Sequence, residues 1–159
     1  MKKPPKKKLQ IIAPNDYPQA LSKPNAARAA KTLRSAQTAE RAQAAMEAQV
    51  PAMRAAILEY VEELEKAQGD MALIFAKAHE IRGFAETAGL VTTGRIAEIL
   101  CRYMDDMERM KKPLDTTLVA LNVSAIGRAA RTEDGDAGMG DMVAAELAAL
   151  VARRLSDAG

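Results

Sequence analysis

The sequence predicts an all-α protein: an antiparallel up-and-down four-helix bundle with an additional N-terminal helix and a short C-terminal helix. Its 159 residues are 48% hydrophobic but only 3% aromatic, and they include no tryptophan. Alanine, leucine, methionine, glutamate, lysine and arginine dominate, and these residues favour helices over strands. Apolar residues recur at alternating spacings of three and four along successive segments, which is typical of helix faces that pack on a core. The connections are only a few residues long, so neighbouring helices are expected to run antiparallel.

Composition also excludes several classes of protein. The single cysteine, Cys101, excludes an intramolecular disulfide, and one histidine with one cysteine cannot supply a structural zinc site. No apolar run approaches the roughly 20 residues that a membrane span needs, and no signal-peptide core follows the basic start. We therefore expect a cytoplasmic protein without a metal site or a membrane span.

Residues 1–24 are predicted to form a flexible, basic, proline-rich tail, because they contain five of the seven prolines. Residues 1–25 carry six lysines and one acid, a net charge of +5, whereas the remainder carries 17 basic and 20 acidic residues, a net charge of −3. The tail is either an electrostatic tether to nucleic acid, anionic lipid or an acidic partner, or a solvated extension. No aromatic residue or arginine is interleaved with the lysines at 2 to 8, which favours the solvated extension. No nucleic-acid partner is expected.

The segment 25–50 is rich in alanine and is predicted to form an N-terminal helix capped by Asn25. Pro51 then marks either a kink or the start of a new helix, because proline is favoured in a first turn and disfavoured inside a helix. The first helix of the bundle is expected to span residues 51–68. Its expected core residues are Met53, Ile57, Tyr60, Leu64 and Ala67.

The next two helices have clear apolar stripes. Asp70 is expected to cap a helix over 70–88, which Gly89 ends, and its core residues are Ile74, Ala78, Ile81, Ala85 and Ala88. Thr92 or Thr93 is expected to cap a helix over 93–111, with Ile96, Leu100, Tyr103, Met107 and Met110 facing the core. Cys101 lies beside that stripe and is expected to be an inert, small apolar residue.

Pro113 is expected to begin the fourth helix of the bundle, which ends near residue 131. Its predicted core residues are Leu114, Leu118, Leu121 and Ala125. The bundle therefore spans residues 51–131. An acidic, glycine-rich linker is predicted over 132–140, and an amphipathic C-terminal helix over 141–159. The predicted core side of this last helix consists of Val143, Leu147, Leu150 and Val151.

One side chain stands out as a candidate for chemistry, the only histidine, His79. There is no glycine-rich phosphate loop and no cluster of metal-ligating residues in the sequence. His79 lies across the helix from the core residues Ile74 and Ile81, so its imidazole is expected to face solvent.

The residues one turn before and after His79 share its helix face. Gly83 costs about 1 kcal/mol relative to alanine in a helix, which indicates that a partner must approach the backbone closely there. Arg82 is a permanent cation with a planar set of donors that suits phosphoryl oxygens. Phe75 is expected on the solvent side, where it would offer a partner an apolar contact.

The run His79-Glu80-Ile81-Arg82-Gly83, followed by Gly89, resembles the histidine-containing phosphotransfer (HPt) domains of bacterial phosphorelays. The family pattern is a histidine, an apolar residue two positions later, a basic residue at +3, and glycines at +4 and +10, and this chain matches all five positions. The resemblance covers about residues 51–131. It implies a four-helix bundle whose second helix exposes a phospho-accepting histidine.

The resemblance also implies roles and partners. His79 would accept the phosphoryl group, Arg82 would stabilise its oxygens, and Gly83 would let the active-site loops of a receiver domain close over the site. Glu80 is assigned to orienting the imidazole. The partner contacts implied are Phe75, Ala76, Lys77 and Glu86. The partners would be receiver domains of response regulators and a sensor kinase, possibly a hybrid one, and the receiver supplies the magnesium ion, so this chain needs no cofactor.

Two alternatives stay open. The run 79–82 also resembles the phospho-accepting box of sensor-kinase dimerisation domains, which would make the chain a dimeric, kinase-like phosphotransfer protein, although the usual proline after that box is missing. The other alternative is a non-catalytic helical adaptor, because a lone surface histidine on a helix usually has no chemical role. The match at Arg82, Gly83 and Gly89 favours a monomeric phosphocarrier over both.

Overall fold

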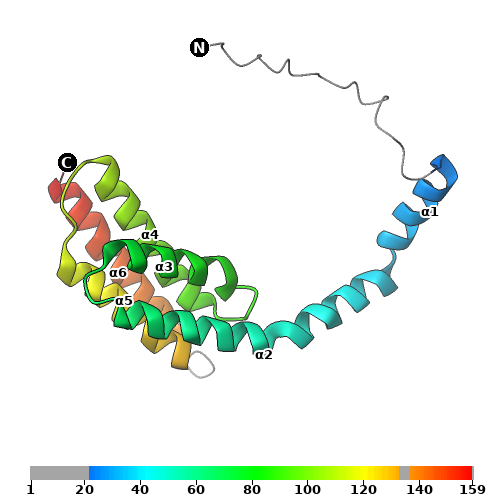
Figure 1. Ribbon diagram of the computed structural model, residues 1–159, viewed down its shortest axis with the longest axis horizontal. Helices are drawn as coiled ribbons and strands as arrows, with labels where there is room; N and C mark the ends of the chain where they lie inside the picture. The colour runs from blue at the N-terminus through cyan, green and yellow to red at the C-terminus, as the bar shows by residue number, and fades with distance from the viewer. Residues whose placement is uncertain (1–21, 133–136, 159) are drawn as a thin grey trace, which may run out of the picture. The chain divides into compact units, whose positions relative to one another are not determined.

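The structure, a computed structural model, describes residues 22–132 and 137–158. These residues form six helices (Figure 1), and none of them lies in a strand, so the all-α prediction is confirmed for them. The chain divides into two compact units, Met1–Ala45 and Met46–Gly159. The predicted tail lies outside the described residues except at its last three positions. Within the described part of the chain, no helix is both long enough and apolar enough to cross a membrane.

The N-terminal unit contains α1 (Lys23–Leu33) and the beginning of α2 (Ala36–Lys66). The predicted single helix over 25–50 is wrong, because the helix is interrupted at Ser35. The Ser35 hydroxyl accepts the backbone N–H of Thr38 at 3.3 Å and donates to the Thr32 carbonyl at 2.8 Å. It thereby caps α2 in place of continuing α1. Pro24 lies in the first turn of α1, where its missing N–H costs no hydrogen bond.

The second unit begins within α2, which continues through Pro51 without interruption. A new helix start at Pro51 is therefore wrong, and the first helix of the predicted bundle corresponds to the second half of α2. Its buried residues are Ile57, Val61 and Leu64, with Ala67 buried just beyond the helix. Val61 had not been predicted, and Met53 and Tyr60 are only partly buried.

Helix α3 (Met71–Ala85) follows the sequence prediction most closely. The Asp70 carboxylate accepts the N–H of Leu73 at 3.0 Å and caps the helix as expected. All five predicted core residues, from Ile74 to Ala88, are buried. Gly89 has a φ of +75°, a conformation that favours glycine. The Leu90 N–H closes the turn on the Ala85 carbonyl at 2.7 Å, so the helix itself ends three residues before the predicted position.

Helix α4 (Val91–Arg109) lies against α3, α5 and α6. The predicted caps Thr92 and Thr93 are wrong, because both threonines are buried inside the first turn, after Leu90. Neighbouring helices approach closely there. A Cβ added at Gly94 would lie 3.1 Å from the Cβ of Ala85, and a Cβ added at Gly140 would lie 2.9 Å from Thr92.

The predicted core side of α4 is confirmed for Ile96, Leu100, Tyr103 and Met107, which are all buried, whereas Met110 is partly buried. Cys101 is also fully buried. Burial raises the pKa of the Cys101 thiol to about 11. Because the thiolate is the reactive form, this agrees with an inert apolar role.

Helix α5 (Thr116–Thr132) begins three residues after Pro113, so the predicted start is wrong. Asp115 caps the helix, accepting the N–H groups of Thr117 at 3.0 Å and Leu118 at 3.1 Å. The backbone N–H of Asp115 donates to the Tyr103 hydroxyl at 2.9 Å, which fixes the start of α5 against α4. The helix is rotated relative to the predicted stripe: Leu121 is 46% exposed. The buried residues are Leu118, Val119, Asn122, Ile126, Gly127 and Ala130.

Helix α6 (Ala137–Ala158) begins four residues before the predicted helix, and residues 133–136 of the predicted linker lie outside the described residues. It packs on α4 and α5, and Arg95 of α4 pairs with Asp141 at 2.5 Å. Val143 and Leu150, two of the predicted core residues, are each 41% exposed. The buried residues are Ala144, Leu147, Val151 and Ala158, so α6 contributes to the core of the second unit.

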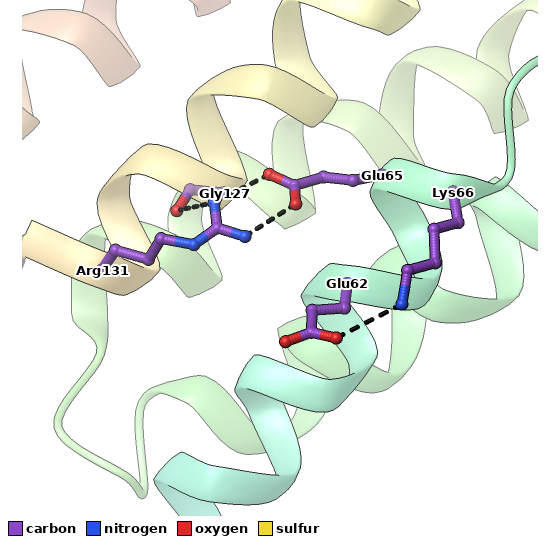
Figure 2. A network of polar contacts seen from close by, with 5 residues as sticks. All are labelled: Glu62, Glu65, Lys66, Gly127 and Arg131. Carbon is purple, nitrogen blue, oxygen red and sulfur yellow. Dashed lines mark hydrogen bonds and ion pairs between the residues drawn. The ribbon is translucent and has the colours of Figure 1, made fainter.

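A bidentate ion pair connects α2 to α5 (Figure 2). The two terminal nitrogens of Arg131 donate to the two carboxylate oxygens of Glu65 at 2.8 and 2.7 Å. One of these nitrogens also donates to the Gly127 carbonyl at 3.0 Å. A Cβ at Gly127 would collide with the Glu65 carboxylate, so glycine makes room for the pair. The hydrogen bond from Arg131 lowers the pKa of Glu65.

We predict that Glu65→Gln lowers the free energy of unfolding by about 0.5 to 1 kcal/mol at pH 7. Because the folded-state pKa of Glu65 is lowered, its contribution is complete above the ordinary pKa of about 4.3 and is lost as the pH falls below it. Urea unfolding should show a larger difference from wild type at pH 7 than near pH 3. Glu62→Gln is the control, since the Glu62–Lys66 pair is largely exposed. A loss of equal size at both pH values would contradict the prediction.

Candidate functional site

His79 lies in the second half of α3, and its side chain is exposed, as the sequence predicts. The opposite face of the helix carries Ile74, Ala78, Ile81 and Ala85, all buried in the core. This packing leaves α3 only one orientation, and that orientation directs the imidazole to solvent.

Phe75 lies one turn before His79, and the two rings contact each other. Their centroids are 6.1 Å apart and their planes meet at 42°. Helical side chains lean toward the N-terminus of the helix, which brings the imidazole toward Phe75. Phe75 is partly buried and packs against the core, so the expectation of a solvent-facing phenylalanine is wrong. The core therefore holds this ring in place beside the imidazole.

Arg82 and Gly83 lie one turn after His79. The Arg82 side chain is half-buried and has no hydrogen-bond or ion-pair partner among the described residues. Gly83 is exposed, and a Cβ added there would have no atom within 4 Å. Packing inside this chain therefore does not require glycine at this position, and the helix surface beside His79 is open.

The two flanks of the imidazole differ. At about 100° per residue, Phe75 and Arg82 lie to one side of His79, and Ala76 and Gly83 lie to the other. One flank therefore carries an aromatic ring and a cation, whereas the other carries only small, exposed residues. Glu86 is exposed two turns after His79. A molecule approaching His79 meets least obstruction over Ala76 and Gly83.

Lys77 and Glu80, also predicted for the site, bond elsewhere. The Lys77 ammonium contacts Glu63 of α2 at 2.7 Å and Glu80 at 3.2 Å, and it lies 4.8 Å from the centre of the Tyr60 ring. The hydrogen bond that Lys77 donates to Glu63, followed by the one it donates to Glu80, raises the pKa of Lys77. The structure contains no hydrogen bond between Glu80 and His79. Lys77 therefore connects α3 to α2, Glu80 bonds Lys77 on the same helix, and neither is bonded to the imidazole.

Phe84 is a surface residue that the sequence analysis left out of the site. Its side chain is 51% exposed on α3. The signal was present in the sequence, because Phe84 falls outside the apolar stripe that runs from Ile74 to Ala88. It lies on the far side of the helix from Arg82, so it enlarges the exposed surface of α3 without approaching the imidazole.

Neither a metal cluster nor a known relative adds to this picture. Over residues 22–132 and 137–158, no three His, Cys, Asp or Glu side chains are grouped so that they could hold a metal ion. No protein-family model, curated protein or solved structure matches this chain. The function is therefore argued from these residues and their geometry.

We predict that Phe75→Leu shifts the proton resonances of the His79 ring, because the ring current of Phe75 acts on the imidazole at the observed distance. Leucine keeps an apolar contact with the core, so the fold is retained. The measurement is a two-dimensional NMR spectrum of the single histidine. Phe84→Leu is the matched control, since it removes the only other phenylalanine, from the same helix. Equal shifts in both variants would contradict the assigned contact.

Proposed function

We propose that this chain is a histidine phosphotransfer protein that carries a phosphoryl group on His79 to or from aspartates of receiver domains. The observation that supports this most is the exposed imidazole one turn away from Arg82, a half-buried guanidinium without a partner in the described chain. A cation with several donors beside a nucleophile suits a phosphoryl group, whose negative charge it stabilises.

The arrangement of helices fits the same proposal. The second half of α2 with α3, α4 and α5 would form the antiparallel up-and-down bundle of such a protein, with His79 on its second helix and α6 as an added helix. We place the protein in the cytoplasm as a monomer, with a sensor kinase and receiver domains as its partners.

The proposed reaction uses a ring nitrogen of neutral His79 as the nucleophile. Its lone pair attacks the phosphorus of an aspartyl phosphate, and the bond from phosphorus to the aspartate oxygen breaks with its electron pair leaving on the carboxylate. The other ring nitrogen loses its proton to solvent or regains one on the return step. The attacking nitrogen carries no proton in the neutral form, so the attack needs no strong base. The magnesium ion belongs to the receiver.

The residues around His79 assist this step by stabilising the phosphoryl group and by leaving space for the receiver. Arg82 donates to the phosphoryl oxygens, and the small residues Ala76 and Gly83 leave room for the receiver's loops. Glu80 bonds Lys77 and leaves the imidazole without an acidic neighbour on that side. A kinase-like mechanism, in which the acid after the histidine assists proton removal, has less support for this reason.

We expect the purified chain to take up one phosphoryl group from phosphoramidate or from a phosphorylated receiver domain. Intact mass spectrometry should show a single adduct that acid removes, because the phosphorus–nitrogen bond of phosphohistidine is acid-labile. His79→Gln should take up none. If the wild-type chain stays unmodified under conditions that load a known phosphotransfer protein, the proposal fails, and a non-catalytic helical adaptor becomes the better description.

We predict that Arg82→Gln slows phosphoryl uptake about 10- to 100-fold, because a hydrogen bond to a charged group is worth about 1.5 to 3 kcal/mol. Arg82→Lys keeps the charge without the planar set of donors, and its rate of phosphoryl uptake should lie between those of wild type and Arg82→Gln. The rate is followed by the growth of the adduct mass. Arg102→Gln, on exposed α4 surface, is the matched control and should react like wild type. Equal rates for Arg82→Gln and Arg102→Gln would remove Arg82 from the site.

A further inference from the structure

The N-terminal unit carries a net positive charge, whereas the second unit carries a net negative charge. Residues 1–45 contain ten lysines and arginines and two acids, a net charge of +8. Residues 46–159 contain 13 basic and 19 acidic residues, a net charge of −6. A separation of this size concentrates positive potential on one part of the chain and attracts polyanions to it.

The described part of this unit has cationic side chains that form no hydrogen bond or ion pair with other described residues. Arg28 and Lys31 of α1, Arg34 directly after α1 and Arg41 of α2 all have exposed side chains, and the side chains of the four have no hydrogen-bond or ion-pair partner among the described residues. Lys31 and Arg34 also line an open hollow with Ala27, Ala30 and Ser35, where α1 gives way to α2. In the second unit, by contrast, several cations pair with acids, among them Lys77, Arg95 and Arg131.

The spacing of the three cations along α1 and its C-cap suits a row of phosphates. Intervals of three residues distribute Arg28, Lys31 and Arg34 along about 9 Å of helix axis. A DNA duplex presents about five phosphates over that length of its own axis. Arginine and lysine together can contact several of these phosphates at once.

The composition of the helices favours a duplex over the other polyanions. A helix that lies on a membrane buries large apolar side chains, but Leu33 is the only one among residues 22–45. Binding of single strands relies on aromatic residues that stack on bases, and residues 22–45 contain none. The sequence argument against a nucleic-acid partner rested on the lysine-only cluster at 2 to 8. The described helices add three arginines without partners.

We propose that the N-terminal unit binds the phosphate backbone of double-stranded nucleic acid without reading its sequence, and that Arg28, Lys31 and Arg34 contribute to this surface. The proposal is independent of phosphotransfer at His79.

The test uses the full chain and a fluorescently labelled DNA duplex of mixed sequence, with anisotropy measured from about 50 to 200 mM salt. Wild type should bind with a Kd on the order of 10⁻⁶ to 10⁻⁴ M and weaken steeply with salt. In the triple variant Arg28→Gln, Lys31→Gln, Arg34→Gln, the slope of log K against log salt should be smaller by about 2.7, which is 0.9 for each lost phosphate contact. Glutamine is a good helix former, so the helix is kept, and circular dichroism checks it.

A second triple variant, Lys112→Gln, Arg128→Gln, Arg153→Gln, changes the net charge equally on exposed positions of the second unit and should keep the wild-type slope. A second set of measurements uses an RNA duplex of the same sequence. Binding of either duplex supports backbone recognition, and the duplex that binds more tightly shows whether DNA or RNA is preferred. Equal losses in the two triple variants, no binding at low salt, or tighter binding to anionic lipid vesicles at equal phosphate concentration would each overturn the proposal.

Discussion

The close approach of helices at the first turn of α4 is the constraint on which the second unit depends. Gly94 lets α3 come within contact of the α4 backbone at Ala85, and Gly140 lets α6 come within contact of Thr92. Side chains larger than hydrogen at either glycine would push these helices apart, and cores tolerate such displacement poorly. Because α4 also packs on α5, one helix fixes the positions of three others.

The candidate site is a consequence of this packing. With Ala85 against Gly94, the apolar stripe of α3 can face only the core, and His79 is left on the opposite side. The same orientation buries part of Phe75 and brings Lys77 to Glu63 and Tyr60 of α2. The imidazole thus stands on a rigid helix between a fixed aromatic ring and an open flank of small residues. Rigid support of this kind suits a residue that must present one atom to a partner.

The features predicted correctly from sequence are those decided within a few residues. The core stripe of α3 and the Asp70 cap depend on helix periodicity and local hydrogen bonds. The errors concern contacts between distant segments. Thr92 and Thr93 look like caps until α3 and α6 bury them, and Leu121 looks like core until the Glu65–Arg131 pair and the Asp115 cap set the rotation of α5. In the site, the exposure of His79 could be predicted from the apolar pattern of its own helix. The ion pairs of Lys77 and Glu80 could not, because the position of α2 relative to α3 was unknown.

Each unit contains cations without a partner among the described residues, but the energetic cost of leaving them unpaired differs between the two units. The cations of α1 are exposed and hydrated, so leaving them without partners costs the fold little. Arg82 is half-buried, and a partly desolvated guanidinium without an anion is unfavourable unless something compensates it. An anion bound at Arg82 restores that missing interaction and, by linkage, stabilises the folded chain. A phosphoryl group on His79 would place such an anion one turn away, so phosphorylation would raise stability at the same position where it adds charge.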